Sequence, residues 1–232
     1  MKTDKIFKEN INYFKKNGNL KLTGIILSVV SAALYFFGWS YVSYVIASIG
    51  LPVGLVLFVV GSIGRSDESD LDGYIARGIE GADAPDPEDD RFERRRLSHL
   101  QPQMAKGYEY ADGLLFKKDK NGHIRSSLYT AATLYPMKES LCVYGRTLSL
   151  IADAKTDIRR EIAYKDVEKV SVSEDERWIK NGKSSVRVKD VRLVLMLSDG
   201  EILSLPVENG IDVERFSEKV NELANNARTS AE

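Results

Sequence analysis

The sequence predicts a membrane α-helical hairpin of two spans, joined to a mainly β cytoplasmic domain that ends in one α-helix. Three observations predict this fold class. Residues 22–64 form an uncharged, largely apolar run of 43 residues, which suits two spans of about 20 residues each. From about Tyr108, short runs of alternating apolar and polar residues are separated by turn residues, as in antiparallel sheets. An apolar stripe at helical spacing then extends from Val213 to Ala227.

The first segment, residues 1–21, is rich in lysine and amphipathic. On a helix, Ile6, Phe7, Ile11 and Phe14 share one face with Asn10, and most of the lysines lie opposite. This pattern is typical of a helix that lies in the membrane interface with its lysines near anionic headgroups. A solvated, frayed terminus is the alternative, since the segment is short.

The membrane segment, residues 22–64, divides into spans at about 22–38 and 42–63. The intervening Gly38-Trp39-Ser40-Tyr41 supplies a turn glycine and two aromatic residues typical of membrane interfaces. Small residues recur every four positions along both spans, at Gly24, Ser28 and Ala32 in the first and at Gly50 and Gly54 in the second. Such spacing lets helices approach closely, either within the hairpin or between copies.

The distribution of lysine predicts the orientation. Six lysines precede the first span and Arg65 follows the second, whereas the turn between the spans has no charge. Positive residues stay on the cytoplasmic side, so we expect a multi-pass protein of the plasma (inner) membrane with both termini in the cytoplasm. The single cysteine, Cys142, agrees with a reducing compartment and is expected to be a buried structural thiol.

Residues 65–104 are predicted to form a linker. Ten acidic residues and one basic residue, Arg77, lie between Asp67 and Asp90, together with Pro85 and Pro87. This composition predicts a mostly disordered spacer. A basic cluster follows on a short predicted helix and either folds against the acidic run or contacts lipid; it comprises Arg91, Arg94, Arg95 and Arg96.

The domain at residues 105–228 is predicted to hold short antiparallel strands in a barrel or sandwich. The expected strands are residues 113–118, 124–135, 141–144, 147–151, 158–164, 167–172, 191–197 and 202–207. Asn121-Gly122 fits a two-residue hairpin turn that pairs Lys120 with His123 and Lys118 with Arg125. Ser198-Asp199-Gly200 fits a three-residue loop, which places Leu195 opposite Leu203 and Leu193 opposite Leu205.

Residues 161–170, with the sequence EIAYKDVEKV, resemble the "I-x-x-x-D-I-x-x-V" strand entry of the pleckstrin-homology-like (PH-like) superfold. The hairpin at residues 193–207, which leads into the helix at 213–223, adds to the likeness. The chain is most similar to the bacterial membrane-anchored and GRAM-type versions. The resemblance covers about residues 108–227, and residues 175–189 look like an insertion between strands. It implies a PH-like barrel or sandwich capped by one C-terminal helix.

Composition and motifs argue against several classes of function. Lys plus Arg and Asp plus Glu nearly balance, at 33 and 34, which disfavours binding to nucleic acid by bulk positive charge. The chain has two histidines and no G-x-S-x-G, H-E-x-x-H or C-x-x-C motif. We therefore expect a non-enzymatic protein without a cofactor or metal site.

The candidate site is basic and lies on the hairpin at Asn121-Gly122. The predicted register places Lys118, Lys120, His123 and Arg125 on one face. In the resembled family, basic residues of the first hairpin bind phosphorylated lipid headgroups, and His123-Ile124-Arg125 matches that pattern in part. The alternative is a solvated hairpin tip whose charges protect a sheet edge from aggregation.

Two functions follow. In the first, the protein is a membrane-anchored scaffold whose cytoplasmic domain binds a protein partner or another copy. In the second, the basic hairpin face binds anionic phospholipid of the same membrane.

Overall fold

The computed structural model describes residues 2–15, 19–38, 40–62, 66–82, 84, 90–181, 184–208 and 211–230. Trp39, Arg65 and the proline-containing residues 85–89, which contribute to the predictions above, lie outside these ranges. The chain forms two compact units, unit 1 at residues 1–67 and unit 2 at residues 68–232.

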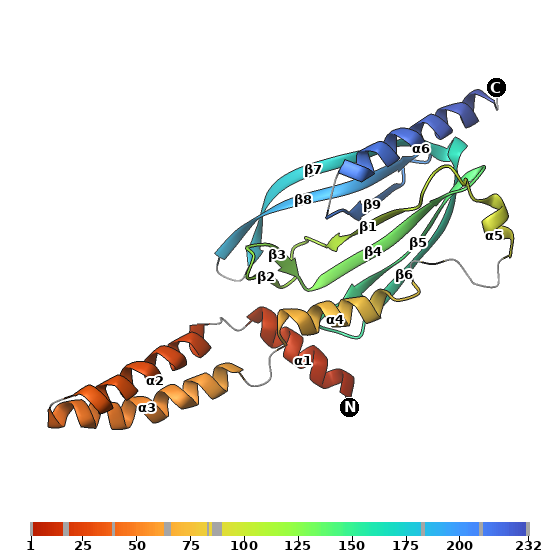
Figure 1. Ribbon diagram of the computed structural model, residues 1–232. Coiled ribbons are helices and arrows are strands. Elements are labelled where there is room, and N and C mark those ends of the chain that lie inside the picture. Colours follow the sequence, from red (N-terminus) through yellow and green to blue (C-terminus); the bar gives the residue numbers. More distant parts are fainter. Residues whose placement is uncertain are drawn as a thin grey trace. The chain divides into compact units, whose positions relative to one another are not determined.

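In unit 1, α1 (Lys2–Lys15) precedes α2 (Asn19–Phe37) and α3 (Tyr41–Ser62) (Figure 1). Among the described residues, two helical segments are long and apolar enough to cross a membrane, at Leu20–Phe37 and Tyr41–Gly61. Their mean hydropathies are 1.9 and 2.3, yet only 11% of each segment is buried. The predicted helices are therefore confirmed within a few residues at each end.

Small residues bring α2 and α3 together within one chain. A Cβ atom added to Gly24 would lie 2.4 Å from the backbone nitrogen of Phe58, and one added to Gly54 would lie 2.5 Å from the Oγ of Ser28. Ser31 and Ala47 are almost fully buried. The small-residue pattern thus packs the hairpin itself, which was one of the two predicted uses.

The helix α1 shows the predicted amphipathic pattern. Phe7 and Phe14 are buried, while Lys5 and Lys8 are exposed. The Oγ of Ser66 donates a hydrogen bond to the Oδ1 of Asn10 at 2.6 Å, which links α1 to the chain beyond α3. Placement of α1 at a membrane surface stays a prediction.

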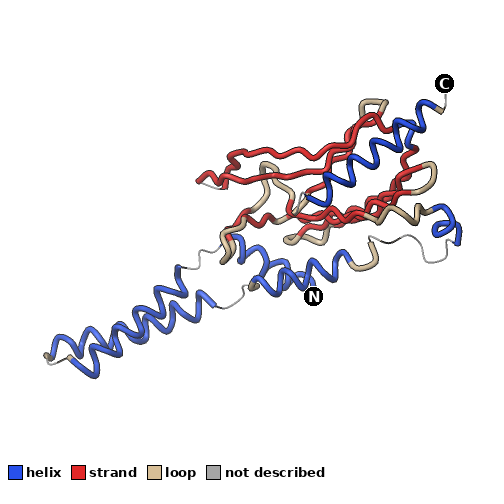
Figure 2. Tube along the Cα trace, turned by 45° about the horizontal axis from the view of Figure 1, so that its top comes forward, coloured by secondary structure: helices blue, strands red, loops and turns tan. Residues whose placement is uncertain are grey.

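Unit 2 consists mainly of antiparallel sheets (Figures 1 and 2). Within the described residues, β1 (Gln103–Tyr108), β4 (Leu128–Pro136), β5 (Ser140–Ser149) and β6 (Lys155–Ala163) form one sheet in that order. After η1 (Tyr164–Asp166), a second sheet contains β7 (Val167–Asn181), β8 (Ser184–Leu197) and β9 (Ile202–Pro206). A small hairpin, β2 (Phe116–Lys118) with β3 (Ile124–Ser126), lies between β1 and β4 in the chain.

The core of unit 2 lies between the inner faces of these sheets and α6 (Ile211–Thr229). Leu193, Leu195 and Leu205 are at most 1% exposed, because the Ser198-Asp199-Gly200 loop sets Leu195 opposite Leu203 and Leu193 opposite Leu205. Gly200 has a φ of 85°, as a left-handed loop position requires. This predicted register is confirmed.

The C-terminal helix α6 is confirmed and packs against β7, η1 and β1. Its apolar stripe, which includes Val213, Phe216 and Val220, enters the core. The side chain of Asn221 fixes the helix to β7: its Oδ1 accepts the N–H of Val170 and its Nδ2 donates to the carbonyl of Val170, both at 2.7 Å.

Several strand predictions need correction. The strand β1 was not predicted, and β5 is one continuous strand where two were expected. Residues 175–189, expected to be an insertion, extend β7 and β8 into a long two-stranded ribbon. Cross-strand ion pairs explain why charged residues suit this ribbon, since Glu174 pairs with Lys189 and Arg177 with Asp190.

The predicted disordered spacer is also wrong for residues 68–79, which form the helix α4 (Glu68–Ile79) of unit 2. Leu71 and Ile75, four residues apart, are buried on one face of α4. The backbone of Gly78 lies close to Leu148 of β5, and the Nη1 of Arg146 donates to the carbonyl of Gly78 at 2.8 Å. Burial of this apolar face offsets the local acidity.

The predicted short basic helix is confirmed as α5 (Asp90–Arg95). Its Phe92 is buried against Met137 and Cys142, and the guanidinium of Arg95 forms an ion pair with Glu161 of β6. Cys142 is 2% exposed, as predicted. Burial, followed by the negative charge of Glu161, raises the pKa of its thiol.

Candidate binding groove

A groove of about 1560 Å³ lies on unit 2. Its walls come from α4, β1, the β2–β3 hairpin, the β7–β8 ribbon, the end of β9 and the first turn of α6. Pockets for small molecules usually measure about 300–1000 Å³. The groove is therefore large enough for a peptide or the surface of a protein.

Apolar and aromatic residues make up part of the lining of the groove. They include Ile75 and Ile79 of α4, Tyr108 of β1, Tyr129 of β4 and Val188 of β8. Tyr110 lies beside them, and its hydroxyl donates to the carbonyl of Ile124 at 2.7 Å. Burial, followed by the charges of Asp190 and Glu208, raises the pKa of Tyr110 to about 12. The hydroxyl of Tyr129 donates to the Oε1 of Glu208 at 3.3 Å, and burial likewise raises the pKa of Tyr129.

The charged residues of the groove are mostly acidic. Among the described lining residues, seven carboxylates face four Lys or Arg side chains. The carboxylates are Asp72, Asp119, Glu174, Asp190, Glu208, Asp212 and Glu214, and the cations are Lys106, Arg125, Arg187 and Lys189. Asp212 and Glu214 are exposed in the first turn of α6, where the helix dipole stabilises carboxylates. Five of the carboxylates form ion pairs with Lys or Arg side chains. The excess negative charge that favours a cationic partner therefore comes from Asp212 and Glu214.

The buried Asp190 belongs to a charge network behind this surface. Its Oδ2 accepts a hydrogen bond from Arg177 at 2.9 Å, and Arg192 also pairs with Glu109 at 2.8 Å. Burial raises the pKa of Asp190, the charge of Glu109 raises it further, and the two arginines oppose both effects. The network holds the ribbon to the chain segment that follows β1.

The predicted register of the hairpin at Asn121-Gly122 is wrong. Lys118 pairs with Ile124 and Lys117 with Arg125. The N–H of Asp119 donates to the carbonyl of His123 at 2.8 Å, so the loop has three residues. Gly122 has a φ of 92°. The carboxylate of Asp119 selects this loop, because it accepts the N–H groups of Asn121 and His123 at 2.9 and 2.8 Å.

Arg125 is engaged by carboxylates rather than free for an external anion. Its Nη1 lies 2.6 Å from the Oδ1 of Asp72, and its Nε lies 3.5 Å from the Oδ2 of Asp119. The Arg125 side chain is 13% exposed and that of Asp119 is 4% exposed. The guanidinium also lies 6.0 Å from the ring centre of Tyr108, within cation–π range. Arg125 therefore connects α4 to the hairpin.

The four predicted site residues therefore differ in their surroundings: three are exposed to solvent, and Arg125 is ion-paired within unit 2. Lys118, Lys120 and His123 are exposed, and the backbone N–H of Lys120 donates to the Oε1 of Glu68 at 3.2 Å. His123 and Arg125 line the groove. The single face of four cations does not form, although anion binding by the exposed members stays a prediction.

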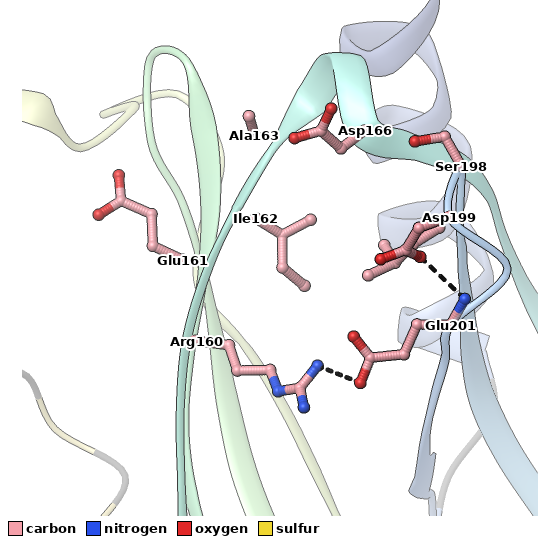
Figure 3. Close-up of a pocket in the computed structure, with 9 residues that line it drawn as sticks. Arg160, Glu161, Ile162, Ala163, Asp166, Ser198, Asp199 and Glu201 are labelled. Atoms are coloured by element: carbon pink, nitrogen blue, oxygen red, sulfur yellow. Dashed lines mark hydrogen bonds and ion pairs between the residues drawn. The ribbon is translucent and has the colours of Figure 1, made fainter.

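A smaller pocket of about 470 Å³ lies between β6 and the β8–β9 loop. Figure 3 shows Arg160 and Glu201 pointing toward one another across it, and their ion pair measures 2.5 Å. Asp199 accepts the N–H of Glu201 at 2.8 Å, and Glu161 points away from the pocket. Because Arg160 and Glu201 already neutralise each other, this pocket offers less to a ligand than the groove does.

Sequence reasoning missed the contributions of α4 and β1 to the groove. The spacing of Leu71 and Ile75 could have revealed α4, and the alternation in residues 103–108 could have revealed β1. The described residues contain no group of three or more His, Cys, Asp or Glu arranged to hold a metal ion. Comparisons of the chain with protein families, with curated proteins and with solved structures find no match.

Proposed function

We propose that this chain is a membrane-anchored scaffold whose β-rich unit binds a protein partner in the groove. The observation that carries the proposal is the combination of apolar and aromatic lining residues with an excess of carboxylates in a groove of peptide size. Interfaces use buried apolar and aromatic surface for affinity and complementary charge for specificity. The partner would therefore present a cationic segment with apolar side chains.

The proposal treats unit 2 as a PH-like domain. What supports this is the order of its elements: the antiparallel sheet β1-β4-β5-β6 precedes the antiparallel sheet β7-β8-β9, and α6 follows. On this assignment the β2–β3 hairpin belongs to the connection between the first two strands of the larger sheet. The resembled family places lipid-binding residues on its first hairpin, so anionic lipid remains the second candidate ligand, through Lys118, Lys120 and His123.

The groove proposal predicts selective binding of a cationic peptide. We expect a short water-soluble peptide of Lys and Val to bind the full-length protein in zwitterionic nanodiscs, and a Glu and Val peptide not to bind. The double variant Asp212→Asn, Glu214→Gln should weaken the binding about tenfold, because it removes carboxylates of the groove. Fluorescence anisotropy of labelled peptide measures both effects, with empty nanodiscs as the blank.

The matched control lies on the same helix. Glu218 and Glu222 are exposed residues of α6 outside the groove, so Glu218→Gln with Glu222→Gln makes the same change in charge elsewhere. This variant should bind like the wild type. Equal binding of both peptides, or equal weakening by both double variants, would contradict the proposal.

The membrane part of the proposal predicts that both termini lie in the cytoplasm. The mostly exposed apolar surfaces of α2 and α3 support insertion, because a soluble protein would bury them. An impermeant maleimide should label Ser40→Cys in intact cells, but should label Ser230→Cys only after permeabilisation. The maleimide should not label the native Cys142, because this side chain is buried. Labelling of Ser230→Cys in unbroken cells would overturn this topology.

A further inference from the structure

One face of the β7–β8 ribbon exposes an aromatic residue beside two cations, of which Arg187 also lines the groove and forms an ion pair with Glu176. Trp178 is 70% exposed and pairs across the ribbon with Arg187. Lys180, two residues along β7, projects from the same face. We name Trp178, Lys180 and Arg187 the Trp178 face. A large exposed tryptophan flanked by cations is typical of protein surfaces that bind membrane interfaces.

The charge of the ribbon changes toward its tip. Near the sheets, acidic and basic residues pair across the strands, as Glu174 does with Lys189. From residue 178 to residue 187 the sequence, WIKNGKSSVR, contains Lys180, Lys183 and Arg187 and no acidic residue. Because Arg187 forms an ion pair with Glu176, the excess positive charge of this stretch comes from its two lysines. The tip is therefore complementary to an anionic surface.

The tip of the ribbon packs against the β2–β3 hairpin. Phe116 of β2, Ile179 of β7 and Val188 of β8 form one buried apolar cluster, and Figure 1 shows this end of the ribbon beside β2 and β3. The hairpin adds the exposed Lys118 and Lys120 at the same end of unit 2. The apolar cluster thus holds the tip of the β7–β8 ribbon beside the tip of the β2–β3 hairpin, and both tips carry exposed lysines.

The segment that joins α3 to α4 is short. Residues 63–67 separate Ser62, at the end of α3, from Glu68, at the start of α4. A chain of that length spans at most about 20 Å. The backbone N–H of Lys120 in the hairpin donates a hydrogen bond to the side chain of Glu68.

We propose that the Trp178 face binds the headgroup region of an anionic membrane, the one that α2 and α3 span. The inference rests on the proposed membrane insertion and adds a second contact with the same bilayer. Trp178 supplies the amphipathic ring that enters the headgroup region, and Lys180 supplies charge complementary to anionic lipid. Arg187 lies beside Trp178 and keeps Glu176 neutralised.

The chain offers its own probes, since it contains two tryptophans, Trp39 and Trp178. The full-length protein is reconstituted in vesicles of phosphatidylcholine and phosphatidylglycerol, with or without bromine on the lipid chains. Trp39→Phe leaves Trp178 as the reporter, and Trp178→Phe leaves Trp39, which the sequence places between the two apolar helices. Bromine quenches a tryptophan that enters the bilayer interface.

We expect quenching and a blue shift of Trp178 in the brominated anionic vesicles, with both effects lost at high salt. Lys180→Glu with Arg187→Glu should abolish the quenching of Trp178. The matched variant Lys155→Glu with Arg159→Glu, which changes exposed residues of β6, should retain it. Circular dichroism checks that both variants are folded.

The two tryptophans separate the possible failures. If Trp39 is not quenched, membrane insertion itself has failed. If Trp39 is quenched while Trp178 emits as in water, the inference about the Trp178 face is wrong. A blue shift of Trp178 that grows with the protein-to-lipid ratio and lacks bromine quenching would assign the face to a second copy and overturn the lipid contact. The lipid contact would also be overturned if neither high salt nor the double variant Lys180→Glu, Arg187→Glu reduced the quenching of Trp178.

Discussion

Replacement of Gly24 by isoleucine is expected to separate α2 from α3. A Cβ atom at this position would lie 2.4 Å from the backbone nitrogen of Phe58 and 2.7 Å from the carbonyl oxygen of Gly54. Both are backbone atoms, so relief of the overlap requires one helix to move. Close approach of small residues is what stabilises such a pair in lipid, and overpacking of this kind costs about 1–3 kcal/mol.

A disulfide trap measures the separation. A Cβ atom built on Gly50 lies 3.3 Å from the Cβ of Ser31, close to the separation in a disulfide. The two cysteines of the double variant Ser31→Cys, Gly50→Cys should therefore form a disulfide within one chain under mild oxidation. Gly24→Ile should slow closure about tenfold, equivalent to about 1.4 kcal/mol. Ala33→Ile, on the exposed side of α2, is the control. Cross-linking between chains instead would refute pairing within the hairpin.

Arg125→Met should destabilise unit 2 by about 2–3 kcal/mol. The substitution leaves the buried carboxylate of Asp119 without its guanidinium partner and removes the ion pair with Asp72 of α4. Breaking a buried pair costs about 3–5 kcal/mol, and the half-exposed Asp72 reduces that figure. The expected fall in Tm is about 4–12 °C, and hydrogen exchange should show faster opening of α4 and the hairpin.

Lys118→Met is the matched control, because Lys118 is exposed on the same hairpin and exposed substitutions change stability by about 0.5 kcal/mol or less. Equal stability of the two variants would contradict the structural role of Arg125.

The effect of Arg125→Met should depend on pH. Burial alone would raise the pKa of Asp119, but hydrogen bonds from the His123 and Asn121 amides and from Arg125 outweigh it and lower the pKa. A carboxylate with a lowered pKa stabilises the folded state above its unfolded pKa of about 4 and loses that contribution as the pH falls through its folded value. The difference between wild type and variant should therefore shrink below about pH 4.

The two hairpins show what the sequence could predict and what it could not. For Ser198-Asp199-Gly200, leucines on both strands must share the buried face, so a wrong loop length would have exposed them. For Asn121-Gly122, the strands are short and polar, and their burial pattern does not select a register. A side chain outside the turn dipeptide, Asp119, decided the loop through its hydrogen bonds.

The groove was harder to predict than the strands because its walls come from distant parts of the chain. The acidic composition of residues 67–90 predicted disorder, yet Leu71 and Ile75 provide enough apolar surface for α4 to pack. The sequence predicted that Arg125 binds an external anion. Its actual partner, Asp72, lies 53 residues earlier in the chain, so the local pattern could not reveal the pair. Local patterns predict elements, whereas long-range ion pairs become visible only when those elements are placed together.

The attachment of α4 has a mechanical consequence. Tension between the apolar helices and the sheets would enter unit 2 at Glu68 and act along α4. The contacts of this helix would then fail one after another, beginning with the bond of Glu68 to Lys120, continuing with Asp72 and Arg125, and ending where Arg146 holds Gly78. Contacts that bear the force one at a time break at a lower force than contacts that share it. Under stretching, α4 would peel away while β1 to β9 stay folded, and it would lengthen the tether without unfolding the sheets.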